Sequence, residues 1–195
     1  MSEVEVRRRP GGRSARVRRA VLEVSIGLLR TRGVEGLSVK EVAATAGVNE
    51  ASIYRRWRTR ENLMLDALLS VPEDVVPVPD TGSLRADLVT YVRSVAAWLD
   101  SPLGAALNRA LATAGDDPEI AQARAHFWGT RYELAGAMVT RAIGRGELPA
   151  DTDARFLLEL VVSPLHFRTL LTRQPLDPAM PERLVDAALR SLDQS

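Results

Sequence analysis

Two short helices joined by a tight turn, between Ser38 and Trp57, constrain the fold of this chain more than any other feature. Ser38 begins a capping box, in which its hydroxyl accepts a hydrogen bond from the Glu41 amide and the Glu41 carboxylate returns to the Ser38 amide. Gly47 marks the end of the first helix, because glycine adopts left-handed backbone angles without steric cost. Asn49 then caps the second helix.

The spacing of apolar residues predicts how these two helices pack. Leu37 and Val42 flank the first cap at the separation of a hydrophobic staple, and Val48 and Ile53 flank the second cap in the same way. Two short helices with an inward apolar side and a glycine-containing turn of about three residues have the pattern of a helix-turn-helix.

Apolar residues recur at helical spacing over the rest of the chain. No segment long enough to form a strand shows the alternation of apolar and polar residues that a half-buried strand requires. We therefore predict an all-α fold. A long helix of about 20 residues starts at Arg13 and ends before Gly33, and Thr59 caps a helix over 60–70. Further helices are predicted at 83–99, 101–111, 116–144, 151–171 with a kink at Pro164, and 181–192.

Charge is unevenly distributed along the chain. Residues 1–60 carry 14 Lys and Arg against 6 Asp and Glu, whereas residues 61–195 carry 12 against 19, so the net charge of +1 hides a basic first third. A short positively charged segment is typical of a polyanion-binding module, because each cation placed near a phosphate releases condensed counterions. We interpret residues 1–12, which contain three consecutive arginines and end in Pro-Gly-Gly, as a flexible basic arm.

Composition excludes several classes of protein. The chain has no cysteine, which removes disulfides, thiolate metal sites and cysteine nucleophiles and fits a reducing cytoplasm. Its longest apolar runs, such as 160–162, fall far short of the roughly 20 residues of a membrane span, and no signal-peptide stretch follows the N-terminal charges. We predict a cytoplasmic protein with no membrane partner.

Residues 38–64, SVKEVAATAGVNEASIYRRWRTRENLM, closely resemble the DNA-binding domain of TetR-family transcriptional regulators. The likeness covers residues 13–70 and places Trp57 where phenylalanine is common in the family. It implies a helix-turn-helix domain at 13–59, a connecting helix at 60–70, and a helical ligand-binding and dimerisation domain at 71–195. The proline-rich start of this last part, 71–82, predicts a linker over the surface.

The resemblance implies that the second helix of the pair lies in the major groove of DNA. Arg55 would pair with guanine, Glu50 would accept from cytosine, and the Ala51 methyl would meet thymine. Tyr54 and Arg60 match positions that bind phosphate, and Arg60 stands where the family more often has lysine. The DNA-binding candidates are Ser38, Lys40, Asn49, Glu50, Ala51, Ser52, Tyr54, Arg55 and Arg60.

A ligand cavity and a dimer interface are implied for the second half of the chain. The candidate cavity walls are Trp98, Phe127, Trp128, Tyr132, His166 and Phe167, each of which also suits an ordinary core position. The apolar residues expected at the interface are Phe156, Leu157, Leu160, Val161, Leu184, Val185 and Leu189. Because no charged pair is clearly committed to the interior, the expected effector is an apolar or amphipathic small molecule.

These observations predict a homodimeric, ligand-responsive repressor that binds a pseudo-palindromic operator in double-stranded DNA. No catalytic residue, metal or cofactor is expected. Two alternatives stay open: a constitutive nucleic-acid-binding protein without a ligand, and a small helical enzyme. The enzyme would use Ser163 near His166 with Asp151, Asp153 or Glu159, or Asp116 with Asp117 as metal ligands. The basic arm at 1–12 either lies along the DNA or stays disordered.

Overall fold

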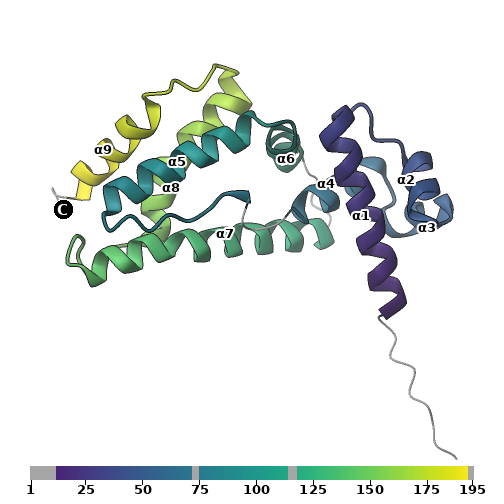
Figure 1. Ribbon diagram of the computed structural model, residues 1–195, viewed down its shortest axis with the longest axis horizontal. Helices are drawn as coiled ribbons and strands as arrows, with labels where there is room; N and C mark the ends of the chain where they lie inside the picture. Colours follow the sequence, from purple (N-terminus) through teal and green to yellow (C-terminus); the bar gives the residue numbers. More distant parts are fainter. Residues whose placement is uncertain (1–11, 72–74, 114–117, 193–195) are drawn as a thin grey trace, which may run out of the picture. The chain divides into compact units, whose positions relative to one another are not determined.

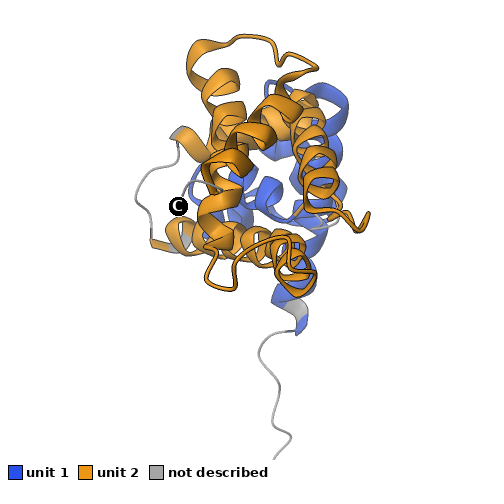
Figure 2. Cartoon of the chain, turned by 90° about the vertical axis from the view of Figure 1, so that its left-hand side faces the viewer, with its two compact units in different colours: residues 1–70 blue, residues 71–195 orange. Residues whose placement is uncertain are grey.

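The computed structural model describes residues 12–71, 75–113 and 118–192, which form helices and connecting segments without a strand (Figure 1). The all-α prediction is therefore confirmed. The chain divides into two compact units, residues 1–70 and residues 71–195, which Figure 2 distinguishes by colour. The predicted arm, except for Gly12, and the paired acids Asp116 and Asp117 lie outside the described residues.

The first unit is built from four helices: α1 (Gly12–Arg32), α2 (Val39–Ala46), α3 (Glu50–Trp57) and α4 (Arg60–Leu69). Helix α1 packs against α2 and α4, and α3 packs against the same two helices. Their shared core consists of the buried side chains Val21, Leu22, Leu29, Leu37, Val42, Ile53, Trp57, Leu63 and Leu68. Residues from all four helices enter this core, so it fixes the position of α3.

The helix caps predicted for the first unit are present. The Ser38 hydroxyl accepts from the Glu41 amide at 3.3 Å, and Gly47 ends α2 in the left-handed region at φ 66°. Asn49 Oδ1 accepts from the Ala51 amide at 2.8 Å. The capping box differs in one respect, because the Glu41 carboxylate accepts from Arg32 at 2.8 Å and thereby ties α2 to the end of α1.

The second unit contains α5 (Leu84–Asp100), α6 (Pro102–Thr113), α7 (Pro118–Gly144), α8 (Ala154–His166), the π-helical turn η2 (Phe167–Thr172) and α9 (Met180–Leu192). Helix α5 packs against α6, α7, α8 and α9, and α8 also packs against α7 and α9. The core between them includes Leu88, Val92, Met138, Val139, Leu157, Val161, Leu165 and Val185. None of the helices in the described ranges has the length and apolarity that crossing a bilayer requires.

Helix α8 does not end at Pro164, where the sequence predicts a kink. It continues to His166 and then widens into η2, which ends at Arg173 with left-handed backbone angles. Proline removes a backbone donor, so the regular hydrogen-bond ladder is interrupted there. Wide π turns inside helices are uncommon and often lie beside functional sites.

The segment 75–82 differs from the surface linker that its prolines predict. Val76 is buried against the core of the second unit, and Val75 and Val78 pack beside it. The Asp87 carboxylate on α5 is fully buried and accepts from both the amide and the hydroxyl of Thr81 at 2.7 Å. Proline content indicated an irregular backbone correctly, but not that the backbone is pinned to the helices.

Candidate DNA-binding surface and ligand cavity

Helix α3 presents one side to the core and the other to solvent. Ile53 and Trp57, four residues apart, are buried, which is the separation of neighbours on one helix face. Of the predicted DNA-binding side chains on and beside α3, Ser52 is half-buried. The exposed ones are Asn49, Glu50, Ala51, Tyr54 and Arg55. The outward side of α3 therefore carries hydrogen-bonding and charged side chains together with the small Ala51.

A polar cluster inside the first unit fixes the C-terminal end of α3. The Trp57 indole nitrogen donates to Asp66 Oδ2 on α4 at 2.8 Å. Arg18 on α1 donates to the same carboxylate from two nitrogens, with its Nε 3.1 Å from Oδ2. Phenylalanine has no N–H to donate, so the tryptophan adds a polar tie that links α3 to both α1 and α4.

The connection between α3 and α4 is a strained three-residue turn. The Thr59 amide donates to the Trp57 carbonyl at 2.7 Å, and Arg58 between them has φ 61° and ψ −48°. These are the angles of a classical γ-turn, which is rare for a residue with a side chain. The Thr59 hydroxyl then caps α4 by accepting from the Asn62 amide at 3.1 Å. Together the turn and the cap set the direction in which α4 leaves α3.

Arg60, predicted to bind phosphate, also makes contacts within the protein. Its Nε donates to the Leu37 carbonyl at 2.8 Å, and its Nη2 donates to the Val34 carbonyl. The side chain thus ties the first turn of α4 to the segment that precedes α2. A guanidinium has five donors, so these bonds leave room for a phosphate, and the phosphate contact stays a prediction. Ser38 and Lys40 are exposed at the start of α2.

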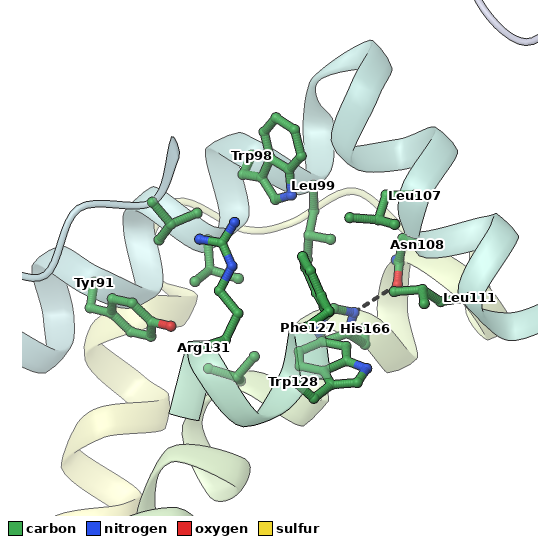
Figure 3. Close-up of a pocket in the computed structure, with 13 residues that line it drawn as sticks. Tyr91, Trp98, Leu99, Leu107, Asn108, Leu111, Phe127, Trp128, Arg131 and His166 are labelled. Atoms are coloured by element: carbon green, nitrogen blue, oxygen red, sulfur yellow. Dashed lines mark hydrogen bonds between the residues drawn. The ribbon is translucent and has the colours of Figure 1, made fainter. Parts of the chain in front are cut away.

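A cavity with mostly apolar walls lies inside the second unit (Figure 3). Its volume is about 60 Å³, and it is partly open to solvent. Helices α5, α6, α7 and α8 supply the walls, together with Val76 from the preceding segment. The lining residues are Val76, Tyr91, Val95, Trp98, Leu99, Leu107, Asn108, Leu111, Phe127, Trp128, Arg131, Val162 and His166.

The polar side chains at one end of the cavity form a chain of hydrogen bonds. His166 Nδ1 lies 2.7 Å from Asn108 Oδ1, the Asn108 amide nitrogen donates to the Thr169 hydroxyl at 2.8 Å, and that hydroxyl donates to the Leu165 carbonyl at 3.0 Å. Because Asn108 Oδ1 can only accept, His166 must carry a proton on Nδ1. Burial lowers the pKa of His166, which favours the neutral ring and leaves Nε2 as an acceptor.

Comparison with known proteins identifies the family of the chain. The sequence model of the bacterial regulatory proteins of the tetR family matches residues 21–67, and that of the tetracyclin repressor-like C-terminal domain matches residues 78–188. The HTH-type transcriptional regulator AqdR of Rhodococcus erythropolis is 33% identical, over 91% of this chain and 86% of its own length. The chain belongs to the TetR family of bacterial regulators.

Other relatives of this TetR-family regulator agree in sequence and in fold. The DNA-binding transcriptional repressor TetR of Mycobacteroides abscessus is 33% identical, over 87% of this chain and 90% of its own. The crystal structure of the TetR family transcription regulator SCO0332 has a TM-score of 0.75 and 30% identity, covering 89% of this chain and 97% of its own. The protein is thus a DNA-binding transcriptional regulator and not an enzyme.

The regulator's cavity contains some of the predicted wall residues but not others. Trp98, Phe127, Trp128 and His166 line it, whereas Tyr132 and Phe167 do not. The Tyr132 ring packs beside Trp128, and Arg155 of α8 covers it at 4.8 Å from the ring centroid. Phe167 is 55% exposed, because the helix changes pitch into η2 at this residue.

Several lining residues of the TetR-family regulator escaped the sequence prediction. Arg131 follows Phe127 and Trp128 by four and three residues, so the helical period placed it on the same face of α7. Asn108 lies between Leu107 and Leu111 on the apolar face of α6 in the same way. Spacing alone does not single out these two residues, because polar side chains at such positions usually reach solvent.

The stability of this regulator is expected to fall below about pH 6.5, in part through His166. Because burial lowers the pKa of His166 in the folded chain from 6.5, the unfolded chain binds the proton more readily, and protonation favours unfolding. The contribution of His166 is therefore complete above pH 6.5 and is lost as the pH falls toward the lowered pKa.

His166→Gln removes this titration. In urea denaturation, the stability difference between the unaltered protein and His166→Gln should shrink as the pH falls from about 7.5 to about 5. The exposed His126 provides the control, since His126→Gln leaves the buried imidazole in place. A His166→Gln difference that stays constant with pH would contradict the expectation.

Proposed function

We propose that this TetR-family regulator is a homodimeric repressor whose affinity for DNA falls when a small molecule occupies the cavity of the second unit. The observation that carries the proposal is the cavity itself, an apolar space with a few converging polar groups. A relative that is 33% identical bears the name of a DNA-binding transcriptional repressor, which supports the direction of regulation.

For DNA recognition, we infer that α3 enters the major groove and that Glu50, Ala51, Ser52 and Arg55 read base edges. Asn49, Tyr54, Arg60 and the start of α2, with Ser38 and Lys40, would hold the phosphate backbone. A two-fold dimer requires a nearly two-fold operator, with the two α3 helices about 34 Å apart or a multiple of that distance.

Substitutions of Arg55 and Arg60 should affect DNA binding differently, because one is proposed to contact a base and the other a phosphate. Arg55→Ala should cost about 1–3 kcal/mol on the preferred site and much less on other sequences, because a base contact is lost. Arg60→Ala should weaken binding to all sequences alike and reduce the salt slope by about 1, because a phosphate contact is lost. The measurement is a salt titration with DNA selected from a random pool by the full chain.

Arg60→Ala also removes the bonds to the Val34 and Leu37 carbonyls, so Arg60→Lys is a useful companion. Lysine keeps the positive charge but does not reproduce the fork of donors that reaches both carbonyls. A normal salt slope in Arg60→Lys and a reduced one in Arg60→Ala would support the phosphate contact. If Arg60→Ala lost only specific binding, the assignment would be wrong.

We propose that a ligand releases DNA through the cavity wall that is nearest in sequence to the DNA-binding unit. Val76, one of its walls, belongs to the segment that follows α4 in the chain, so a ligand that displaces this side chain also acts on the connection to the DNA-binding unit. The coupling cannot exceed the difference in ligand affinity between the two arrangements, typically about 1–3 kcal/mol, or 5- to 150-fold in DNA affinity.

The test is to measure affinity for the selected DNA with and without small molecules that bind the second unit. A fall in DNA affinity on ligand binding supports a ligand-controlled regulator. DNA affinity that is indifferent to every bound ligand would instead leave a constitutive DNA-binding protein.

A further inference from the structure

His166 lies at the polar end of the cavity of the second unit, and two contacts fix its ring. Its Nδ1 lies 2.7 Å from Asn108 Oδ1. The ring also meets Trp128 edge to face, with the two centroids 5.7 Å apart. Figure 3 shows the bond between His166 and Asn108 beside the rings of Phe127 and Trp128. The imidazole is therefore part of the cavity wall and is held in a defined orientation.

The direction of these hydrogen bonds follows from the Thr169 hydroxyl, which has a single proton. The carbonyl oxygens of Leu165 and His166 lie 3.0 Å and 3.3 Å from this hydroxyl, and a carbonyl can only accept. The hydroxyl proton therefore goes to a carbonyl, and the Asn108 amide donates to the hydroxyl oxygen. This arrangement turns the Asn108 carbonyl oxygen toward Nδ1 of His166, which must carry a proton.

This tautomer leaves the second ring nitrogen of His166 without a proton. Burial lowers the pKa of His166, which favours the neutral ring, and the neutral ring holds its one proton on Nδ1. Nε2, the ring nitrogen farther from the backbone, is then an acceptor only. None of the hydrogen bonds within the described part of the chain uses this nitrogen. Because the side chain is half-buried and lines the cavity, it presents an acceptor to a bound ligand.

The acceptor places a requirement on the ligand. A molecule that displaces water from His166 restores a hydrogen bond to Nε2 only if it offers an O–H or N–H group, and an acceptor left unpaired opposes binding. The nearby walls include Trp98, Phe127 and Trp128. An aromatic ring suits such walls, because ring pairs stack or meet edge to face. The enclosed volume of about 60 Å³ is small, so a larger ligand extends toward the open side of the cavity.

We propose that the effector of this regulator is an aromatic molecule that donates a hydrogen bond from an O–H or N–H group to Nε2 of His166, while its ring lies among Trp98, Phe127 and Trp128. The proposal rests on the proposed function, since it names the ligand class of the same cavity. It adds one required donor group to the apolar or amphipathic effector that the sequence predicts.

The first experiment determines the tautomer of His166 in the protein without a ligand. The chain has two histidines, so a long-range proton–nitrogen correlation spectrum of the isotope-labelled full chain contains two imidazole patterns. His126→Gln identifies the pattern of His166. At about pH 7.5, where an unperturbed imidazole is already mostly neutral, we expect the proton on Nδ1. Free histidine in water prefers the proton on Nε2, so this result is diagnostic, and a protonated Nε2 would overturn the proposal.

The second experiment adds two probes of nearly identical shape, indole and benzofuran, of which only indole has an N–H group. Indole should bind and should move the nitrogen resonance of His166 Nε2 upfield, because an acceptor nitrogen is more shielded when it is hydrogen-bonded. Benzofuran should leave this resonance nearly unchanged. Equal shifts with the two probes, or no binding of indole at millimolar concentration, would overturn the proposal. Both experiments use the native His166, so they do not depend on how a variant at this position folds.

A pair of histidine variants locates the acceptor by isothermal titration calorimetry. The ratio of the two dissociation constants should favour indole about fivefold more in the unaltered protein than in His166→Leu, because one hydrogen bond is lost. His126→Leu is the matched control, because His126 is an exposed histidine on α7 and is not among the described cavity walls. An unchanged ratio in His166→Leu, or an equal fall in His126→Leu, would overturn the role of His166.

Asn108→Leu tests whether the hydrogen-bond chain selects the tautomer. Leucine has a similar branched shape but offers no acceptor to the Nδ1 proton of His166, so the proton should move to Nε2 in a large fraction of the molecules. The preference for indole should then fall although His166 is still present. A proton that stays on Nδ1, with the full preference for indole, would overturn the role of Asn108.

Failure of this inference can be distinguished from failure of the proposed function. If benzofuran or another ligand without a donor binds as well as indole and releases the selected DNA, the proposed function stands and the ligand class is wrong. If indole binds through His166 but DNA affinity does not change, the ligand class stands and control by the ligand is lost.

Discussion

Replacing Asp66 by alanine is expected to loosen α3 and to weaken binding to every DNA sequence. Three donors lose their acceptor in this variant: the Trp57 indole nitrogen and two nitrogens of Arg18. Trp57 is 7% exposed, so its N–H is left in a largely apolar surrounding. An unsatisfied buried donor costs about 1–3 kcal/mol, and the loss of the pair with Arg18 adds to it.

The expected effect is on position and not on contact with DNA, because Asp66 is on α4 and bonds to the inward side of α3. Hydrogen exchange of the full chain should show faster exchange of the α3 amides, since the helix opens locally more often. DNA affinity should fall by a similar factor for preferred and random sequences. A selective loss on the preferred site alone would contradict a positioning role.

Two variants separate the parts of this effect. Glu23→Ala removes the same charge at an exposed position on α1, so it controls for the change in electrostatic attraction to DNA. Trp57→Phe keeps the buried ring and removes only the N–H, for which we expect a smaller change of about 1 kcal/mol. If Glu23→Ala accelerates α3 exchange as much as Asp66→Ala does, the cluster is not what holds the helix.

The parts of the fold that sequence predicted best are those decided by near neighbours. Ser38, Gly47, Asn49 and Thr59 end or begin helices through bonds to residues two to four positions away, so their roles are readable from short spacings. The Asp66 cluster was not predicted, because it joins residues up to 48 positions apart and depends on how three helices meet.

The cavity was predictable only in part, for a related reason. Helical spacing places side chains on a face of their own helix, but the packing of neighbouring helices decides which face lines a cavity. Trp128 and Tyr132 lie four positions apart on α7, but only Trp128 lines the cavity. Tyr132 packs beside Arg155 instead. The sequence predicts the proline-rich segment at the surface, whereas Val76 in it is buried, because proline content reports backbone shape and not burial.

Burial within one chain separates the residues expected at the dimer interface into those that a partner could reach and those that it could not. Leu157, Val161 and Val185 are fully or almost fully buried in the core of the second unit, so they are not available to a partner. Leu160, Leu184 and Leu189 are partly buried, and Phe156 is 56% exposed. Phe167 and Leu171 continue the exposed apolar surface onto η2. The apolar side chains that stay at least partly accessible on α8 and η2 are Phe156, Leu160, Phe167 and Leu171, and we propose this stripe as the dimer contact.

Phe156→Glu combined with Phe167→Glu is expected to convert a dimer into monomers. Burying one such side chain contributes about 1.5–3 kcal/mol, and a two-fold interface contains every residue twice. Loss of one phenylalanine therefore removes about 3–6 kcal/mol per dimer, or roughly 10²- to 10⁴-fold in the dissociation constant, before the cost of burying glutamate is added. Light scattering at micromolar concentration measures the change directly.

The DNA affinity of this double variant should collapse, because two recognition helices that are no longer joined must bind their half-sites independently. Leu134→Glu supplies the control, since Leu134 is an exposed leucine on α7 that lies outside the stripe. Its protein should remain a dimer and retain its affinity for the selected DNA. If Leu134→Glu dissociated while the double phenylalanine variant stayed dimeric, the interface would lie on α7. If both stayed dimeric, with normal DNA binding, the stripe would have no part in dimerisation.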